Sequence, residues 1–222
     1  MIVLHHLNNS RSQRILWMLE ELEVPYEIRR YERDPNTMLA PASLKAMHPL
    51  GKSPIITDGD ATLAESGAII EYLGRKYGQD TLIPSEDSAD YWQYVYWLHY
   101  AEGSLMPPFL LRLVFQKVKS NPMPFFARPI ARMIADKTMQ TFIGPQIRTH
   151  LDFVEQHLGN HEWFAGDRLS GADIQMSFPL EAGVARGVID GGYPNIRAYV
   201  TRFQSRPAYQ RGLEAGGEYA YA

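Results

Sequence analysis

Residues 49–67 read PLGKSPIITDGDATLAESG, and this stretch decides the fold. Asp58-Gly59 is a strong turn signal, so Ile55-Ile56 and Ala61 to Leu63 predict the two strands of a β-hairpin. Glu65-Ser66-Gly67 then predicts the start of a helix, which has an apolar stripe and ends near Gly78.

Upstream of the hairpin, the sequence predicts a strand, a helix and a second strand. Met1 to Leu7 and Tyr26 to Tyr31 are short apolar or alternating runs, as strands are. Between them, Ser12 to Glu23 has helical period. After the second strand, a loosely helical stretch runs to Met47. The apolar face of the first helix comprises Ile15, Leu16, Leu19 and Leu22. The order βαβαββα predicts an α/β domain over residues 1–78.

The rest of the chain predicts a second, all-α domain over residues 88–222, after a linker at 79–87 without periodicity. A total of 222 residues suits two modest domains. A long helix from about Asp87 to Val118 should be kinked or broken at Pro107-Pro108, and another, from Phe125 to Leu158, should be irregular near Pro145. Further helices are predicted from a capping box at Ser170-Gly171-Ala172-Asp173 and from Pro194 and Pro207.

Composition excludes several classes of function. With a formal net charge of −3, the chain lacks the excess of Lys and Arg that a nucleic-acid binder needs. The absence of cysteine excludes disulfides, thiolate metal sites and a cysteine nucleophile, so any sulfur chemistry needs a borrowed thiol. No apolar run is long enough to span a membrane, and no metal-ligand spacing appears among the histidines. We therefore expect a cytoplasmic protein without a metal or a membrane partner.

The strand-to-helix junction at residues 7–14, LNNSRSQR, is a candidate anion site, because hydroxyls and free backbone N–H groups meet there at a positive helix end. The alternative interpretation is that Ser10 or Ser12 only caps the helix. Glu65-Ser66 is likewise either a site for charged groups of a ligand or only the cap of the helix that begins there. Ser53 precedes Pro54, and a cis bond there would leave its backbone polar groups available to a peptide-like ligand.

These motifs together resemble a known family. The βα junction, G-K-S-P at 51–54 and E-S-G at 65–67 resemble the glutathione-binding half of cytosolic glutathione S-transferases. WLHYAEGSLMP at 97–107 and LSGADI at 169–174 resemble the helical half, and NSRSQRILW at 9–17 is similar to a bacterial and fungal subgroup. The resemblance spans the whole chain. It implies a thioredoxin-like N-terminal domain, an all-helical C-terminal domain and a homodimer.

The resemblance also implies a role for each motif residue in glutathione binding. Lys52 should reach the glycine carboxylate, and Ser53, before a cis Pro54, should pair through its backbone with the cysteinyl unit. Glu65 and Ser66 should hold the ammonium and carboxylate of the γ-glutamyl unit. Glutathione is thus the implied co-substrate and partner.

Ser10 falls where Ser-type members of the family keep their catalytic hydroxyl. No Tyr precedes Tyr26, which argues against a tyrosine mechanism, and Asn9 and Ser12 remain alternates near the thiol. A hydrogen bond from Ser10 to the sulfur, with the helix end behind it, could lower the thiol pKa by about 2 units, or roughly 2.7 kcal/mol of thiolate stabilisation.

The implied reaction is conjugation of that thiolate to a small apolar electrophile. Glutathione-dependent reduction of organic hydroperoxides and a non-catalytic, glutathione-binding interaction protein are the alternatives. Four residues are candidates for the electrophile pocket: Trp97, Tyr100, Met106 and Phe115. Trp97, Tyr100 and Met106 could equally be core, and Phe115 could meet a partner chain.

Overall fold

The computed structural model describes residues 1–34, 37, 39–78 and 81–222. Its single sheet has four strands in the order β2-β1-β3-β4. These strands are β1 (Ile2–Leu7), β2 (Tyr26–Tyr31), β3 (Ile55–Asp58) and β4 (Ala61–Ala64). β1 runs parallel to β2 and antiparallel to β3, and β3 pairs with β4 through the Asp58-Gly59 turn. The predicted βαβ unit followed by a hairpin is confirmed.

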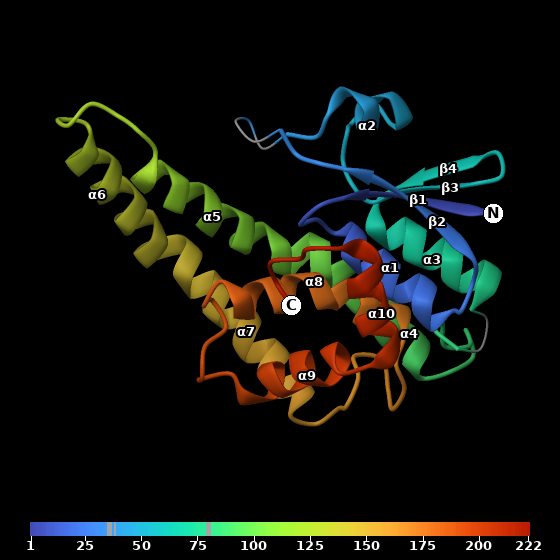
Figure 1. The fold of residues 1–222 in the computed structure, drawn as a ribbon. Helices are drawn as coiled ribbons and strands as arrows, with labels where there is room; N and C mark the ends of the chain where they lie inside the picture. Colours follow the sequence, from blue (N-terminus) through green and yellow to red (C-terminus); the bar gives the residue numbers. More distant parts are fainter. Residues whose placement is uncertain (35–36, 38, 79–80) are drawn as a thin grey trace.

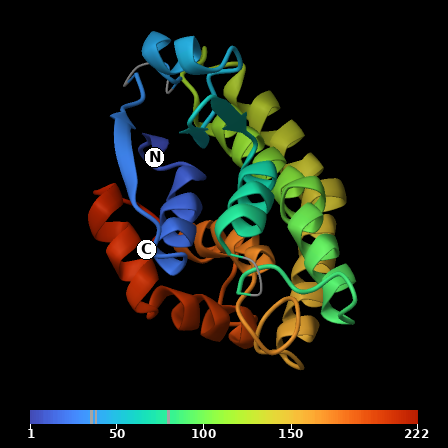
Figure 2. The ribbon, with the colours of Figure 1, turned by 90° about the vertical axis from the view of Figure 1, so that its right-hand side faces the viewer.

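Three helices belong to this sheet (Figure 1), namely α1 (Ser12–Glu21), α2 (Ala42–Met47) and α3 (Ser66–Tyr77). The sequence predicted one apolar face on α1, but residues 12–19 are all buried. The reason is that α1 packs against β1 and α3 on one side and against α8 (Gly171–Ala185) and α10 (Pro207–Gly216) on the other. Figure 2 shows α1 and α10 side by side.

The C-terminal half is helical over its described residues, as predicted. Its helices besides α8 and α10 are α4 (Asp90–Tyr100), α5 (Met106–Ser120), α6 (Arg128–Thr138), α7 (Gly144–Leu158) and α9 (Pro194–Gln204). The predicted linker lies between α3 and α4, and its residues 79–80 lie outside the described part of the chain. Figure 1 shows α5 and α6 running out together as an arm beyond the other helices.

A π-helical turn marks each predicted irregularity. Ala101–Leu105 joins α4 to α5 just before Pro107-Pro108, and Met139–Ile143 joins α6 to α7 just before Pro145. Because a proline has no N–H, it leaves a carbonyl of the preceding turn without its usual partner, and the wider π turn accommodates that loss. Each long helix therefore continues past its prolines as a second α-helix.

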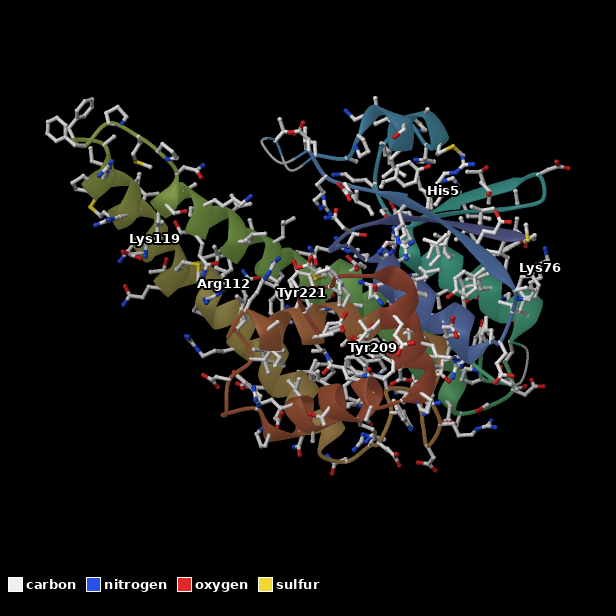
Figure 3. All side chains as sticks on the ribbon, in the orientation of Figure 1. His5, Lys76, Arg112, Lys119, Tyr209 and Tyr221 are labelled. Atoms are coloured by element: carbon white, nitrogen blue, oxygen red, sulfur yellow. The ribbon has the colours of Figure 1, made fainter. Side chains whose placement is uncertain are left out.

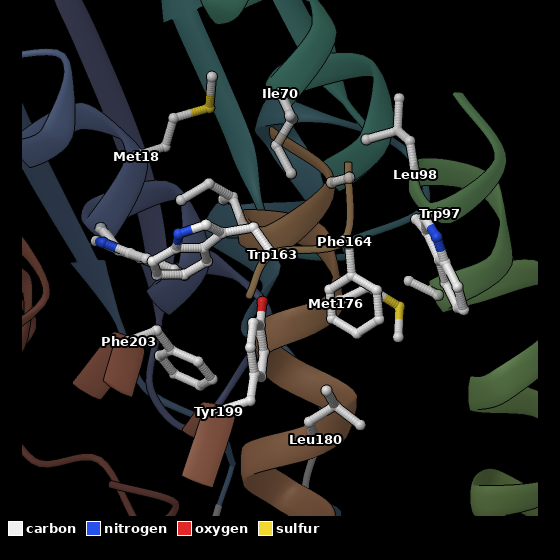
Figure 4. Close-up of a cluster of buried hydrophobic side chains, with 14 of the residues drawn as sticks. Met18, Ile70, Trp97, Leu98, Trp163, Phe164, Met176, Leu180, Tyr199 and Phe203 are labelled. Atoms are coloured by element: carbon white, nitrogen blue, oxygen red, sulfur yellow. The ribbon is translucent and has the colours of Figure 1, made fainter. Parts of the chain in front are cut away.

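The helical core is centred on α8, whose residues 171–183 are all buried. The predicted capping box is present at its start, where Asp173 Oδ2 accepts hydrogen bonds from Ser170 N (2.8 Å) and Ser170 Oγ (2.9 Å). Around α8, aromatic rings from α4, α9 and the loop before α8 pack closely, including Trp97, Phe164 and Tyr199 (Figure 4).

Arg14 on α1 is fully buried and joins the two halves of the chain. Its guanidinium donates to Glu102 Oε1 (2.8 Å) in the first π turn and to Gln175 Oε1 (2.7 Å) on α8. It also reaches Ser66 Oγ (3.4 Å) at the start of α3. Burial by itself would raise the pKa of Glu102, but Arg14 and Arg11 outweigh it and hold that pKa below its usual range. The ion pair thus remains charged at neutral pH.

Replacing Glu102 with Gln should destabilise the protein, because the variant leaves the buried charge of Arg14 without a counter-charge. We expect the free energy of unfolding in urea to fall by about 3 kcal/mol. Glu162→Gln is the matched control, since Glu162 is 61% exposed and lies 3.9 Å from Arg202. That variant should lose less than about 1 kcal/mol. Equal losses in the two variants would contradict a central role for the buried pair.

Candidate active site

A cavity of about 700 Å³ lies between the sheet domain and the helical domain. We call it the interdomain cavity, and its volume is within the roughly 300–1,000 Å³ typical of ligand pockets. The β1–α1 junction and the loop around Ser53 form one wall, and α5, the end of α8 and the C-terminal tail form the other. Residues far apart in the chain therefore meet around one space.

Two serine hydroxyls lie together on the first wall. Ser10 Oγ is 3.3 Å from Ser53 Oγ, and both residues line the interdomain cavity. The hydroxyl of Ser53 donates to the His5 carbonyl (3.2 Å) and accepts from Leu7 N (3.4 Å). The side chain of Ser53 therefore links the loop to β1 by hydrogen bonds, a role that the sequence did not predict.

The two alternates for Ser10 occupy different positions. Ser12 is completely buried and does not line the cavity. Its hydroxyl lies 2.8 Å from Ser10 Oγ and 2.9 Å from His6 Nδ1. Asn9 lines the cavity with a positive φ of 48°, and its side-chain oxygen accepts from Ala220 N (2.8 Å) in the tail. Ser10 is thus the hydroxyl of this junction that faces the cavity.

The loop before β3 has the predicted geometry. The Ser53-Pro54 peptide bond is cis, and Gly51 has a φ of 55°, which favours glycine. A side chain at Gly51 would also meet Lys45 Cγ at 2.6 Å. Lys45, Lys52 and Ser53 all line the interdomain cavity.

Glu65 and Ser66 are near this loop, although they are not among the residues that line the cavity. Ile55, directly after the cis proline, pairs with Ala64 across the hairpin, so Glu65 and Ser66 begin α3 at the same end. Glu65 is exposed with a positive φ of 73°, whereas Ser66 is buried beside Arg14. The candidate glutathione-binding residues thus gather at one end of the hairpin.

Seven Lys or Arg side chains line the cavity, and no Asp or Glu of the described residues does. They are Arg11, Arg33, Lys45, Lys52, Arg112, Lys117 and Arg186. Arg11 donates to Glu102 (2.8 Å), and its guanidinium lies over the Phe178 ring. Burial and the nearby Arg11 lower the pKa of Arg33. The cavity is therefore positively charged although the whole chain has a net charge of −3.

Comparison with known proteins identifies the family. Models of the glutathione S-transferase N-terminal and C-terminal domains match residues 10–76 and 125–207. Glutathione S-transferase 3 of Schizosaccharomyces pombe is 41% identical over 96% of this chain and 87% of its own length. The chain belongs to the glutathione S-transferase family.

Other similar proteins agree with this assignment. Glutathione S-transferase 1 of Saccharomyces cerevisiae is 38% identical over 96% of this chain and 94% of its own length. A solved glutathione S-transferase structure from Actinobacillus pleuropneumoniae superposes with a TM-score of 0.80 at 34% identity, covering 99% of this chain and 94% of that one. The protein is an enzyme that conjugates glutathione, and glutathione is its co-substrate.

The apolar wall of this transferase differs from the predicted one. Met106 lines the cavity with Phe109, Leu110 and Leu113 of the same helix. Trp97 takes the core position that the sequence left open as the alternative, because it is 1% exposed and packs against Phe164 in the helical core (Figure 4).

Tyr100 and Phe115 are also outside the cavity lining. The hydroxyl of Tyr100 is 2.6 Å from His150 Nδ1, which holds the ring in the core beside α7. Phe115 packs against the same core from α5. These rings are spaced helically, as pocket residues would be, but helical spacing does not tell which side of a helix faces the cavity.

Sequence analysis also missed several residues that line the cavity of this transferase. Phe178, Arg186 and Tyr221 come from the end of α8 and from the tail, which carry no recognisable motif. Arg112 and Lys117 belong to a basic run on a helix, for which the sequence favours a solvated face and leaves a mild attraction for anionic ligands as the alternative. Among the described residues, no group of three or more His, Asp or Glu side chains is arranged to hold a metal ion. No helix in this part of the chain is long and apolar enough to cross a membrane.

Acid should destabilise this transferase through His6. Burial, together with the charge of Arg30, lowers the pKa of His6 from 6.5 to about 4. Between these two pH values the unfolded chain binds a proton at His6 that the folded chain does not, so the stability present above pH 6.5 is lost as the pH falls. We expect His6→Gln to flatten this part of the stability profile by about 3 kcal/mol, measured by urea unfolding.

His99→Gln is the control for this experiment, because His99 is an exposed histidine on α4. It should keep the slope of the parent protein. A parent-like slope in His6→Gln would show that His6 is not held neutral by its surroundings.

Proposed function

We propose that Ser10 activates the bound glutathione by donating a hydrogen bond from Oγ to the sulfur. One observation carries this assignment: of the two serines at the β1–α1 junction, only Ser10 lines the cavity, whereas Ser12 is sealed beneath it. Ser10 Oγ accepts a hydrogen bond from Ser12 N (3.2 Å) and donates its own proton to Ser53 Oγ. Its contact with Ser53 Oγ, at 3.3 Å, is long enough to be exchanged for the sulfur.

The chemical step then follows from thiolate formation. A free thiol has a pKa near 8.5, and a donor at the sulfur favours the charged form. The thiol proton leaves to solvent, the sulfur forms a bond to an electrophilic carbon, and the leaving group departs with the bonding electron pair. The positive charge of the cavity favours the same thiolate, because Lys and Arg side chains line it and no Asp or Glu of the described residues does.

Glutathione is proposed to bind with its cysteinyl unit along Ser53 and its glycine carboxylate at Lys52. Lys52 is exposed and lines the cavity, so its ammonium is free to move to a carboxylate. The γ-glutamyl end would extend to Glu65 and to the start of α3 at Ser66, where helix N–H groups favour a carboxylate. The cytoplasm is the proposed location.

Ser10→Ala should raise the pKa of the bound thiol by about 2 units and lower kcat by about 10- to 100-fold at pH 7, with little change in the Kd of glutathione. The pKa is read from thiolate absorbance near 240 nm as the pH is varied. Ser53→Ala is the control, because it removes the hydroxyl beside Ser10 in the cavity lining, and it should leave the pKa of the bound thiol near its parent value.

Either of two results would overturn the assignment. A parent pKa in Ser10→Ala would remove Ser10 from the reaction. Tight glutathione binding with an unshifted thiol pKa in the parent protein would favour a binding protein without catalysis.

A homodimer is also proposed, and the support is an apolar face on the projecting arm. Leu111, Val114 and Val118 of α5 are 38%, 46% and 37% exposed, and their spacing places them on one helical face. Phe125 and Phe126 at the tip are 81% and 67% exposed. Contiguous exposed apolar groups of this kind mark protein interfaces.

Val114→Asp should weaken this dimer, because a carboxylate would be buried without a partner in the interface. Light scattering after gel filtration should report a dimer for the parent and a monomer-rich population for the variant at low micromolar concentration. Lys119→Gln, on the same helix, should remain dimeric. A monomeric parent would contradict the proposal directly.

A further inference from the structure

The positive charge of the interdomain cavity exceeds what glutathione can neutralise. Apart from Arg11, which is paired with Glu102, and Arg33, which has an interaction of its own, five cationic side chains line the cavity. Glutathione in its thiolate form has two carboxylates, one ammonium and one sulfur anion, a net charge of about −2. In the proposed binding mode, Lys52 meets the glycine carboxylate of glutathione, and Ser10 meets the sulfur anion. Cations on the opposite wall remain.

Arg112 and Lys117 on α5 are the clearest of these. Neither makes an ion pair or a side-chain hydrogen bond with any other described residue. Arg112 is half-buried in the wall of the cavity, and Lys117 is exposed on the same wall. Arg186, at the end of α8, donates a hydrogen bond to the Tyr221 hydroxyl and lies over the Tyr221 ring. Tyr221 is an uncharged partner.

The same wall is apolar between these cations. Met106, Phe109, Leu110 and Leu113 recur at the spacing of one helical face, and Lys117 ends the series. From Met106 to Lys117 the helix rises about 16 Å, so the apolar residues lie between the start of α5 and the cation at Lys117. Phe178 of α8 and Val188 after this helix add apolar surface to the cavity.

We infer that the electrophile of this enzyme is an amphipathic anion, an apolar body that bears the reactive carbon and ends in a carboxylate held by Arg112 and Lys117. This inference rests on the proposed function of Ser10 and refines the small apolar electrophile expected from the sequence. An anionic group placed near those two side chains regains the hydrogen bonds and charge pairing that the cavity leaves unmet. A neutral electrophile of the same shape would leave them unpaired.

A matched pair of probes tests the charge alone. 4-Chloro-3,5-dinitrobenzoate and its methyl ester react with the thiolate in the same way: a C–S bond forms, the C–Cl bond breaks, and chloride leaves with the electron pair. For each probe, kcat/KM is divided by the rate constant of free glutathione thiolate, which removes the intrinsic difference in reactivity. The enzyme should favour the carboxylate by at least tenfold on this scale.

Arg112→Gln and Lys117→Gln should each reduce this preference, and Arg112→Gln should do so by about tenfold. Lys119→Gln is the matched control, because it removes the same charge from the same helix outside the cavity lining (Figure 3). It should keep both the preference and the rates. Raising the ionic strength should shrink the preference of the parent enzyme, since salt screens partly exposed charges.

Three outcomes would overturn the inference. The first is an ester used as well as the carboxylate while Ser10 still lowers the thiol pKa, which would leave the proposed function intact. The second is an equal loss of preference in Lys119→Gln, which would indicate a long-range field instead of a binding group. The third is calorimetric binding of two glutathione molecules per chain, with the second lost in Arg112→Gln, because the cations would then serve glutathione itself. Failure to conjugate either probe, with an unshifted thiol pKa, would instead remove the proposed function.

Discussion

The buried guanidinium of Arg14 is the interaction on which the arrangement of the molecule depends. A charge removed from water costs several kcal/mol unless it is paired and hydrogen-bonded. Glu102, Gln175 and Ser66 meet that requirement from the first π turn, α8 and α3. These partners hold α1 in one position between the two halves of the chain. Because the β1–α1 junction precedes α1 directly, the same contacts fix where Ser10 stands.

The cavity beside that junction combines two kinds of surface. The sheet domain contributes hydroxyls and a cis-proline loop, which are close to one another because β1 and β3 are paired neighbours. The helical domain contributes an apolar face of α5 that also bears cations. Neither wall alone encloses a ligand. The reactive sulfur of glutathione and the electrophile would meet only where the two walls face each other.

Local patterns predicted the parts of the fold that local physics controls. The Asp58-Gly59 hairpin, the Ser170 capping box and the irregularities before the prolines all follow from hydrogen bonds within a few residues. The single apolar face predicted for α1 was wrong, and the sequence could not choose between core and pocket for Trp97, for the opposite reason. Residues 12–19 are buried all round because a distant helix, α10, covers them, and Trp97 faces the core because α7 and the loop before α8 pack on it.

The sequence by itself determined the order of the elements, the family resemblance and the candidate residues Ser10, Lys52, Ser53, Glu65 and Ser66. Only the tertiary structure decided which of two neighbouring serines lines a cavity, and that the cavity is basic in a chain of net charge −3. The physical reason is that composition sums charges over the whole chain, whereas a ligand experiences the few within a Debye length. Those few come from segments that only folding brings together.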